Sequence, residues 1–535
     1  MRRCRRARGS LPVLRTVGLR PGSRWPGIAC LALALSASAC RASDRDGAQT
    51  ETLTVAYCCD EWLMSPNWQM PAMHMLFLPL TVRNANDDLE GRLARSWEHS
   101  SDYRSWTVHL RTDVRWHDGA PVTAHDVAFT LDLLTHPAVL HYPPDAYSVA
   151  VLDDSTYTIE YRKVGPGSPL DTYSVYYPRH LLEGLDPQEF ARWEYWTRPV
   201  GNGPFRYVRH EPGVGMELEA NPDFYAGEPA IRRVVIKFVP GAPLVTDLLS
   251  GEVDLAPMMN RMDVLTLGED PRFQVHATPY PHRGKGIFWN HRRPPFDEAR
   301  VRRAITLAID RPELLRALSL PDETPLFDVI FTARQFRQGQ LPPPLEADSA
   351  GAARLLAEAG WRDHDGDGIR DRGGTPFRFT ALVPAGAESD ELAVLVQARL
   401  RRFGIAMEIR PLDGDAVRRR RIAGDFDAVF GNHLMDAPGQ GSPSAEWFGH
   451  ESASGYENLS VAARLDSLAA ALDPAEADRL HRVMWPDFQR DLPVTFLQPV
   501  VSWTVSRQRV RGLGRPHVLD PMSAVEMLWI EEDSN

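Results

Sequence analysis

The stretch Val114-Arg-Trp-His-Asp-Gly-Ala-Pro-Val-Thr-Ala-His-Asp-Val127 carries the clearest local structure in this chain of 535 residues. Asp118-Gly119 lies between two extended segments and predicts a hairpin turn, because glycine tolerates positive φ. Thr123, followed three residues later by Asp126, is typical of a capped helix N-terminus. A turn that passes within a few residues into a helix indicates a fold that mixes strands and helices.

The residues around this stretch extend the same alternation of elements. After the cap, one apolar face predicts a helix through Val127, Leu131 and Leu134. Before the turn, apolar and polar side chains alternate in residues 106–111, which predicts a half-buried strand. Further strands are expected at residues 52–57, 157–161 and 234–238. A later helix is expected to open at Asp297 and to end before Pro312.

Strands mixed irregularly with helices predict an α/β or α+β protein of more than one layer. The length is too great for one simple core, so we expect two or three domains. Hydrophobic residues make up 43% of the chain and charged residues 24%, which is typical of a globular protein. No stretch reaches the roughly 20 apolar residues of a membrane-spanning helix.

The charge is unevenly distributed along the chain. The formal net charge is −11, yet residues 1–40 contain eight Arg and no Asp or Glu. The rest of the chain is therefore more acidic than the total suggests. An acidic body argues against nucleic acid as the main partner, because phosphate binding requires basic patches.

The N-terminal segments follow one another in the order that is typical of an export signal. An Arg-rich region is followed by an apolar run from Ile28 to Ser38 and by Ala37-Ser38-Ala39-Cys40. The end of this segment resembles the lipobox of bacterial lipoproteins, in which the Cys is acylated and becomes the first mature residue. The lipobox usually has Leu three residues before the Cys, where this chain has Ala37, so ordinary signal cleavage without a lipid is the alternative. Residues 41–50 are polar and are expected to form a flexible tether.

Five Cys occur in the chain. Cys4 and Cys30 lie in the leader and Cys40 is assigned to the lipid, which leaves the neighbours Cys58 and Cys59. Two adjacent Cys make no disulfide framework. They are interpreted as small core residues, with a local redox pair as the alternative.

Eight phrases, in order over about residues 53–515, resemble the bacterial extracellular solute-binding proteins of family 5, the dipeptide, oligopeptide and nickel receptors of ABC importers. The phrases are Leu93-Ala-Arg-Ser-Trp-Glu98, the stretch 114–127, Gly201-Asn-Gly-Pro-Phe205, Asn221-Pro-Asp-Phe-Tyr225, Ser250-Gly-Glu-Val-Asp254, residues 290–310, Gly360-Trp361 and Ser454-Gly-Tyr-Glu-Asn458. Most of them also have a purely structural explanation as turns, since Gly, Pro and Asn set particular backbone angles.

The resemblance implies a two-lobed periplasmic-binding-protein fold of type II, with an extra subdomain in the first lobe and a hinge. Residues 1–40 are then a signal peptide and 41–50 the tether. The first lobe takes residues 51–282, the second takes 283–500, and 501–535 return to the first. Chain crossings are expected near residues 280–290 and 498–503. The resemblance further implies a monomer that captures a ligand between its lobes and delivers it to permease subunits. It also implies export to the periplasm or the cell surface, where the lipid on Cys40 anchors the protein to the membrane.

In peptide-binding members of the family, an Asp of the second lobe pairs with the α-ammonium of the ligand. The corresponding segment here is Gly431-Asn-His-Leu-Met-Asp-Ala-Pro-Gly439, and Asp436 is the candidate; the alternative is a solvated loop Asp. The local phrase departs from the commoner one with Asp-Pro. Further candidates for lining the ligand site are Met435, Trp447, Trp289, Asp60 and Glu61. No Arg stands out as a clamp for a ligand carboxylate.

An Asp-rich segment after Gly360-Trp361 forms a second signal. Counted from Asp363, its carboxylates fall at positions 1, 3, 5 and 9 as Asp363, Asp365, Asp367 and Asp371, with Gly at position 6 and the carbonyl of Ile369 at position 7. This is the opening of a calcium loop. Position 12, which should be a bidentate Glu, is Gly374, so an Asx-type turn on the surface is the alternative. We expect no other cofactor.

An enzyme and a receptor for another solute are the competing functions. The sequence contains no nucleophile elbow, H-E-x-x-H, phosphate-binding Gly loop or Ser-x-x-Lys, so a secreted hydrolase is disfavoured. His117 and His125 do not have metal-ligand spacing. A receptor for a nickel chelate, an oligosaccharide or an opine would have the same fold and different contact residues. Peptide is the preferred ligand on the resemblance.

Overall fold

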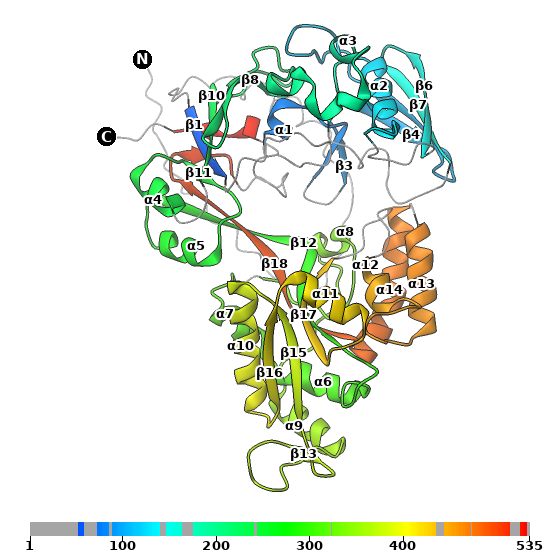
Figure 1. The fold of residues 1–535 in the computed structure, drawn as a ribbon, viewed down its shortest axis with the longest axis vertical. Coiled ribbons are helices and arrows are strands. Elements are labelled where there is room, and N and C mark those ends of the chain that lie inside the picture. The colour runs from blue at the N-terminus through cyan, green and yellow to red at the C-terminus, as the bar shows by residue number, and fades with distance from the viewer. Residues whose placement is uncertain are drawn as a thin grey trace, which may run out of the picture. The chain divides into compact units, whose positions relative to one another are not determined.

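The computed structural model describes residues 52–57, 72–84, 88–139, 146–162, 175–239, 243–322, 324–434, 443–471, 473–513 and 525–531. All of its elements lie in one compact unit, Gln49–Asn535. The fold is mixed α/β with two lobes and several sheets, as expected (Figure 1). No helix in the described ranges combines the length and the apolar character that crossing a membrane demands.

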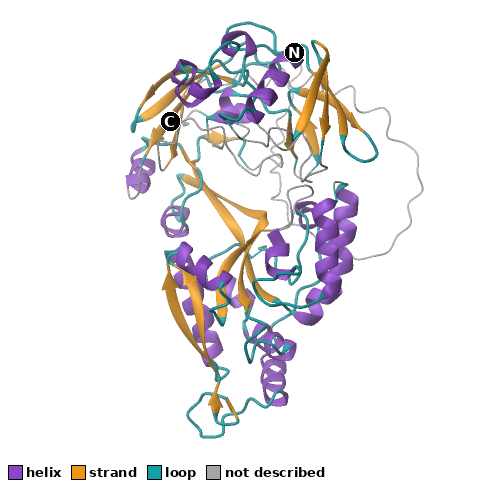
Figure 2. Cartoon of the chain, turned by 45° about the vertical axis from the view of Figure 1, so that its right-hand side comes forward, coloured by secondary structure: helices purple, strands orange, loops and turns teal. Residues whose placement is uncertain are grey.

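One sheet of ten strands runs through both lobes. Its order is β16 (Ala406–Leu412), β15 (Arg378–Pro384), β17 (Ala428–Leu434), β12 (Phe273–Trp289), β18 (Val494–Arg507), β11 (Leu255–Ala256), β1 (Thr52–Tyr57), β10 (Arg233–Phe238), β9 (Gly215–Ala220) and β8 (Phe205–Glu211). The long antiparallel strands β12 and β18 connect its two halves (Figures 1 and 2).

The smaller sheets belong to separate parts of the chain. A four-stranded sheet has the order β4 (Ala94–His99), β5 (Ser105–Leu110), β7 (Thr156–Tyr161) and β6 (Tyr147–Asp153). The two-stranded sheets are β2 (Thr81–Arg83) with β3 (Leu89–Gly91), β13 (Asp371–Arg372) with β14 (Thr375–Pro376), and β19 (Val510–Arg511) with β20 (Trp529–Ile530).

Helices occur both before and after the long strand β12 in the chain. Before β12 they are α1 (Met73–Leu76), α2 (Ala124–Thr135), α3 (Arg179–Leu182), α4 (Pro243–Ser250), α5 (Arg261–Gly268) and the 3-10 helices Pro187–Arg192 and Glu194–Thr197. After β12 they are α6 (Ala299–Ala308), α7 (Arg311–Ala317), α8 (Ala333–Arg337), α9 (Ser349–Glu358), α10 (Ala387–Arg401), α11 (Gly414–Ile422), α12 (Pro443–Phe448), α13 (Leu459–Ala470) and α14 (Pro474–Asp491).

The buried residues form cores that follow the two lobes. One core unites strands of the first 260 residues with Val510, Val525, Leu528 and Ile530 near the end of the chain. Two further cores lie on opposite faces of β12, since neighbouring side chains of a strand point to opposite faces: Ile287 belongs to one and Phe288 to the other. The lobe boundaries at residues 282–283 and 500–501 stay a prediction.

The predicted helix after residue 123 has the expected cap. The Asp126 carboxylate accepts a hydrogen bond from the Thr123 backbone N–H at 2.8 Å and a second from the Arg179 N–H at 2.9 Å, which holds the start of α3. Burial of Val127, Leu131 and Leu134 confirms the apolar face. The helix expected from Asp297 begins two residues later, at Ala299, with Glu298 at the N-cap.

Candidate functional site

The phrase Gly201-Asn-Gly-Pro-Phe205 packs directly against α1 and against the turn after Val114. A Cβ at Gly201 would lie 1.9 Å from the Leu76 carbonyl oxygen, and one at Gly203 would lie 2.5 Å from that of Met75. The Leu76 oxygen instead accepts hydrogen bonds from the backbone N–H groups of Asn202 and Gly203. These glycines therefore permit close approach of two backbones, and the phrase builds the first lobe.

His117 joins the same contact and is neutral. Its Nδ1 accepts a hydrogen bond from the Gly201 N–H at 3.1 Å, and its Nε2 donates to the Gly203 carbonyl at 3.1 Å. Burial lowers the pKa of His117 to about 4, despite the bond to Gly203, which raises it. With both nitrogens engaged by the backbone, His117 is a structural residue.

The buried state of His117 predicts a pH dependence of stability. The unfolded chain binds a proton near pH 6.5, whereas the folded chain does so near pH 4, so stability is complete above pH 6.5 and is lost as the pH falls towards 4. Between pH 7 and pH 5 we expect His117 to contribute a loss of about 2 kcal/mol in the free energy of unfolding.

Urea unfolding of wild type and His117→Gln at both pH values checks this expectation. His291, whose pKa burial lowers to about 3, titrates in both proteins and cancels in the comparison. Equal losses of stability in the two proteins would contradict the assignment.

Trp289, predicted to line the ligand site, lies in the core of the second lobe. Its side chain is fully buried on β12. The indole Nε1 donates to the Thr495 hydroxyl at 3.1 Å, and the ring stacks on Phe296 at 4.6 Å between centroids. In this structure, Trp289 therefore packs within the core of the second lobe.

Trp447, on α12, packs on the other face of β12. Its ring stacks on that of Phe288 with 4.0 Å between centroids, and the Arg421 guanidinium lies 4.9 Å from the ring centre. The Trp447 carbonyl accepts from the hydroxyl of Ser454 at 2.6 Å, so Ser454-Gly-Tyr-Glu-Asn458 anchors this helix. Trp447 connects the sheet with α11.

Asp60, Glu61, Met435 and Asp436 lie outside the described residues, as do Cys40, Cys58 and Cys59. The strands that precede Asp60 and Glu61, and Met435 and Asp436, are described. β1 ends at Tyr57 and, like β11 with which it is parallel, runs antiparallel to β18. β17 ends at Leu434 and runs antiparallel to β12. Because β12 runs from the first lobe to the second and β18 runs back, β1 ends towards the second lobe and β17 towards the first.

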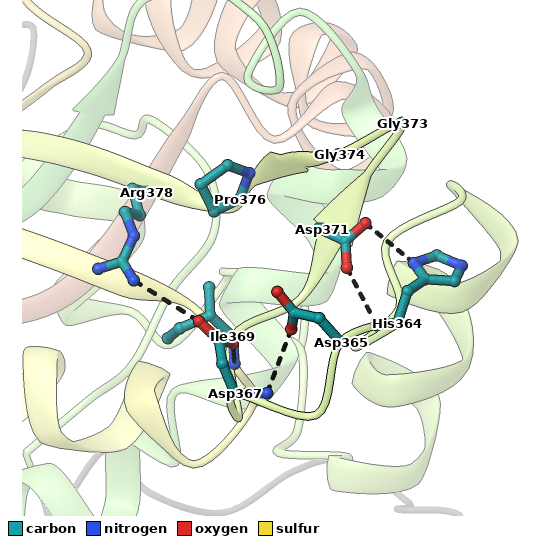
Figure 3. A pocket seen from close by; sticks show the side chains of 9 residues that line it. All are labelled: His364, Asp365, Asp367, Ile369, Asp371, Gly373, Gly374, Pro376 and Arg378. Carbon is teal, nitrogen blue, oxygen red and sulfur yellow. Dashed lines mark hydrogen bonds and ion pairs between the residues drawn. The ribbon is translucent and has the colours of Figure 1, made fainter.

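The Asp-rich segment is a loop between α9 and β13 whose carboxylates serve its own backbone (Figure 3). Asp363 accepts from the N–H groups of Gly366 and Gly368, and Asp367 accepts from that of Ile369. Both Asp371 oxygens bond His364, at its N–H and at its Nδ1.

The hydrogen bonds of this loop are those of Asx-type turns. Carboxylate oxygens of Asp363, Asp365 and Asp367 nevertheless lie within 4.8 Å of one another on exposed residues. Calcium binding here stays a prediction of the sequence, with Gly374 in place of the bidentate ligand.

Comparison of the sequence with known proteins identifies the family to which it is similar. The model of the bacterial extracellular solute-binding proteins, family 5 Middle, matches residues 88–456. The oligopeptide-binding protein AppA of Bacillus subtilis (strain 168) is 27% identical over 69% of this chain and 70% of its own length. The nickel-binding periplasmic protein of Escherichia coli (strain K12) is 24% identical over 69% and 71%.

A solved structure gives the same fold. AppA from Bacillus subtilis in complex with a nonapeptide superposes with a TM-score of 0.62 and 22% identity, covering 90% of this chain and 99% of that chain. The family match extends over more than half of the chain. The chain therefore belongs to the bacterial extracellular solute-binding proteins of family 5, the substrate-binding components of ABC importers.

Proposed function

We propose that this protein captures peptides between its two lobes and delivers them, chemically unaltered, to the permease subunits of an ABC importer. The observation that carries the proposal is the family match over residues 88–456, together with two long strands that connect the lobes. Closure of hinged lobes around a ligand is an established mode of capture. The oligopeptide-binding relative supports peptide as the ligand class.

The proposal includes export and a membrane anchor. The Arg-rich leader, the apolar run and the small residues before Cys40 support cleavage at this Cys and its acylation. The mature protein would then work as a tethered monomer in the periplasm or at the cell surface. As a carrier it performs no chemistry on its ligand, in keeping with the named relatives, which are binding proteins.

A second candidate is a metal chelate, which the nickel-binding relative favours. The fold would be the same, and only the contacts with the solute would change.

A ligand panel separates the two candidates. Protein lacking residues 1–40 is heated alone, with a random library of di- to pentapeptides, with nickel–histidine, and with an oligosaccharide mixture. We expect the peptide library to raise the midpoint of thermal unfolding, because a ligand that binds only the folded state stabilises it by mass action. Native mass spectrometry of the purified protein should show a retained peptide. A rise with nickel–histidine or the oligosaccharides alone would remove peptide as the ligand.

A further inference from the structure

Three polar side chains form a row across adjacent strands of the large sheet. Lys285 on β12 pairs with Asn432 on β17 to one side and with Gln498 on β18 to the other. Directly paired residues of antiparallel strands present their side chains on the same face. The next row along β12, Gly286 with Gly431 and Phe496, belongs to the opposite face of the sheet.

A β-bulge places Gln498 in this row. Gly286 pairs with Phe496 and Lys285 with Gln498, which leaves Leu497 as an extra residue of β18. Leu497 is fully buried in the core of the second lobe. Bulges of this kind redirect a side chain and are frequent beside functional sites.

Burial increases along the row. Asn432 is exposed, whereas Lys285 is 8% and Gln498 3% exposed. The Oε1 atom of Gln498 is buried and accepts no hydrogen bond in the described part of the protein. A buried acceptor without a donor is unfavourable, and native structures rarely contain one without a reason.

The row lies where the chain passes from one lobe to the other. Phe496, two residues before Gln498, packs in a second-lobe core. Trp503, five residues after it, packs against a core of the second lobe and also against the core of α5 and β11. At the exposed end of the row, β17 ends two residues beyond Asn432, immediately before Met435 and Asp436.

We infer that Gln498 is a ligand-binding residue whose Oε1 accepts a hydrogen bond from an N–H group of the captured peptide. The inference rests on the proposed function and adds a contact to it. A peptide main chain supplies N–H donors at regular spacing, and main-chain hydrogen bonds are a general source of peptide affinity. The bound peptide would approach from the Asn432 end and satisfy the acceptor that the protein leaves without a donor.

The test uses Gln498→Met, which removes the acceptor and keeps the length of the side chain, with Gln498→Leu as a second variant. Full-length protein purified in detergent is titrated with a random tri- to pentapeptide library, and the apparent Kd is compared with that of wild type. We expect binding to weaken about tenfold, the effect of losing one hydrogen bond at a desolvated site. The Tm of the ligand-free variants should stay the same or rise, because an unsatisfied buried acceptor has been removed.

Gln274→Met is the matched control. Gln274 lies on the same strand pair, opposite Ser506, but its amide donates to the Gln508 side chain at 2.9 Å. The control should leave the apparent Kd unchanged.

Three results would overturn the inference. Equal affinities of wild type and both Gln498 variants would remove Gln498 from the site and leave the proposed function intact. Weaker binding together with a lower Tm of the ligand-free variants would assign Gln498 a structural role. Absence of peptide binding by the wild type would overturn the proposed function and this contact together.

Discussion

Arg311→Met is expected to lower the free energy of unfolding by about 3–5 kcal/mol, because the substitution leaves Asp328 buried without its counter-charge. The two side chains are only 2% and 1% exposed. The Arg311 guanidinium bonds both Asp328 oxygens, at 2.7 and 3.1 Å. It also donates to the carbonyl oxygens of Leu345 at 2.6 Å and Phe496 at 3.3 Å. One side chain thus holds together α7, two loops and β18.

Chemical denaturation of the purified variant measures this effect. Arg316→Met, an exposed position on the same helix, should change stability by less than about 0.5 kcal/mol. The double variant Arg311→Met/Asp328→Leu should recover much of the loss, since replacing a buried ion pair by apolar residues is often close to neutral. A loss below 1 kcal/mol for Arg311→Met alone would show that water reaches the pair, and the burial argument would then be wrong.

Asp436→Asn is expected to weaken peptide binding by about 2–5 kcal/mol if its carboxylate pairs with the α-ammonium of the ligand. Truncation of one partner in a desolvated charge pair leaves the other charge buried alone, which accounts for most of this penalty. Calorimetric titration with a peptide from the panel above gives the affinity. Asp415→Asn, an exposed carboxylate at the start of α11, is the control and should have no effect.

A peptide with an acetylated N-terminus tests whether Asp436 recognises the α-ammonium, because two proteins and two peptides together form a thermodynamic cycle. Acetylation removes the ammonium, so wild type and Asp436→Asn should bind the acetylated form with similarly low affinity. Equal affinity of both proteins for the free peptide would exclude Asp436 from the site. Wild-type affinity that is insensitive to acetylation would instead show that the ammonium is not the recognised group.

Local elements were predictable because their signals are local. β1 occupies the predicted residues 52–57, and the cap at Thr123 and Asp126 is present. β5 ends at Leu110, one residue earlier than expected. Gly201 and Gly203 were predicted as turn residues from their type, but their close approach to α1 depends on chain more than 120 residues away and leaves no trace in the local sequence.

The candidate site was less predictable, because its residues are brought together by contacts between distant parts of the sequence. Trp289 is an aromatic residue beside a motif, and only the tertiary structure places its indole against Thr495. The row of Asn432, Lys285 and Gln498 depends on strand register over more than 140 residues and on the extra residue Leu497. A register of this kind cannot be inferred from alternation within one strand.

The shared core of the first lobe has a consequence for the order in which the protein assembles. Val510, Val525 and Ile530 pack with strands from the first 260 residues, so that lobe cannot complete its interior until residues 510–530 have been synthesised. The second lobe draws its cores from the continuous stretch between Ile287 and Trp503. During synthesis, the middle of the polypeptide can therefore finish folding before the lobe that contains its beginning does.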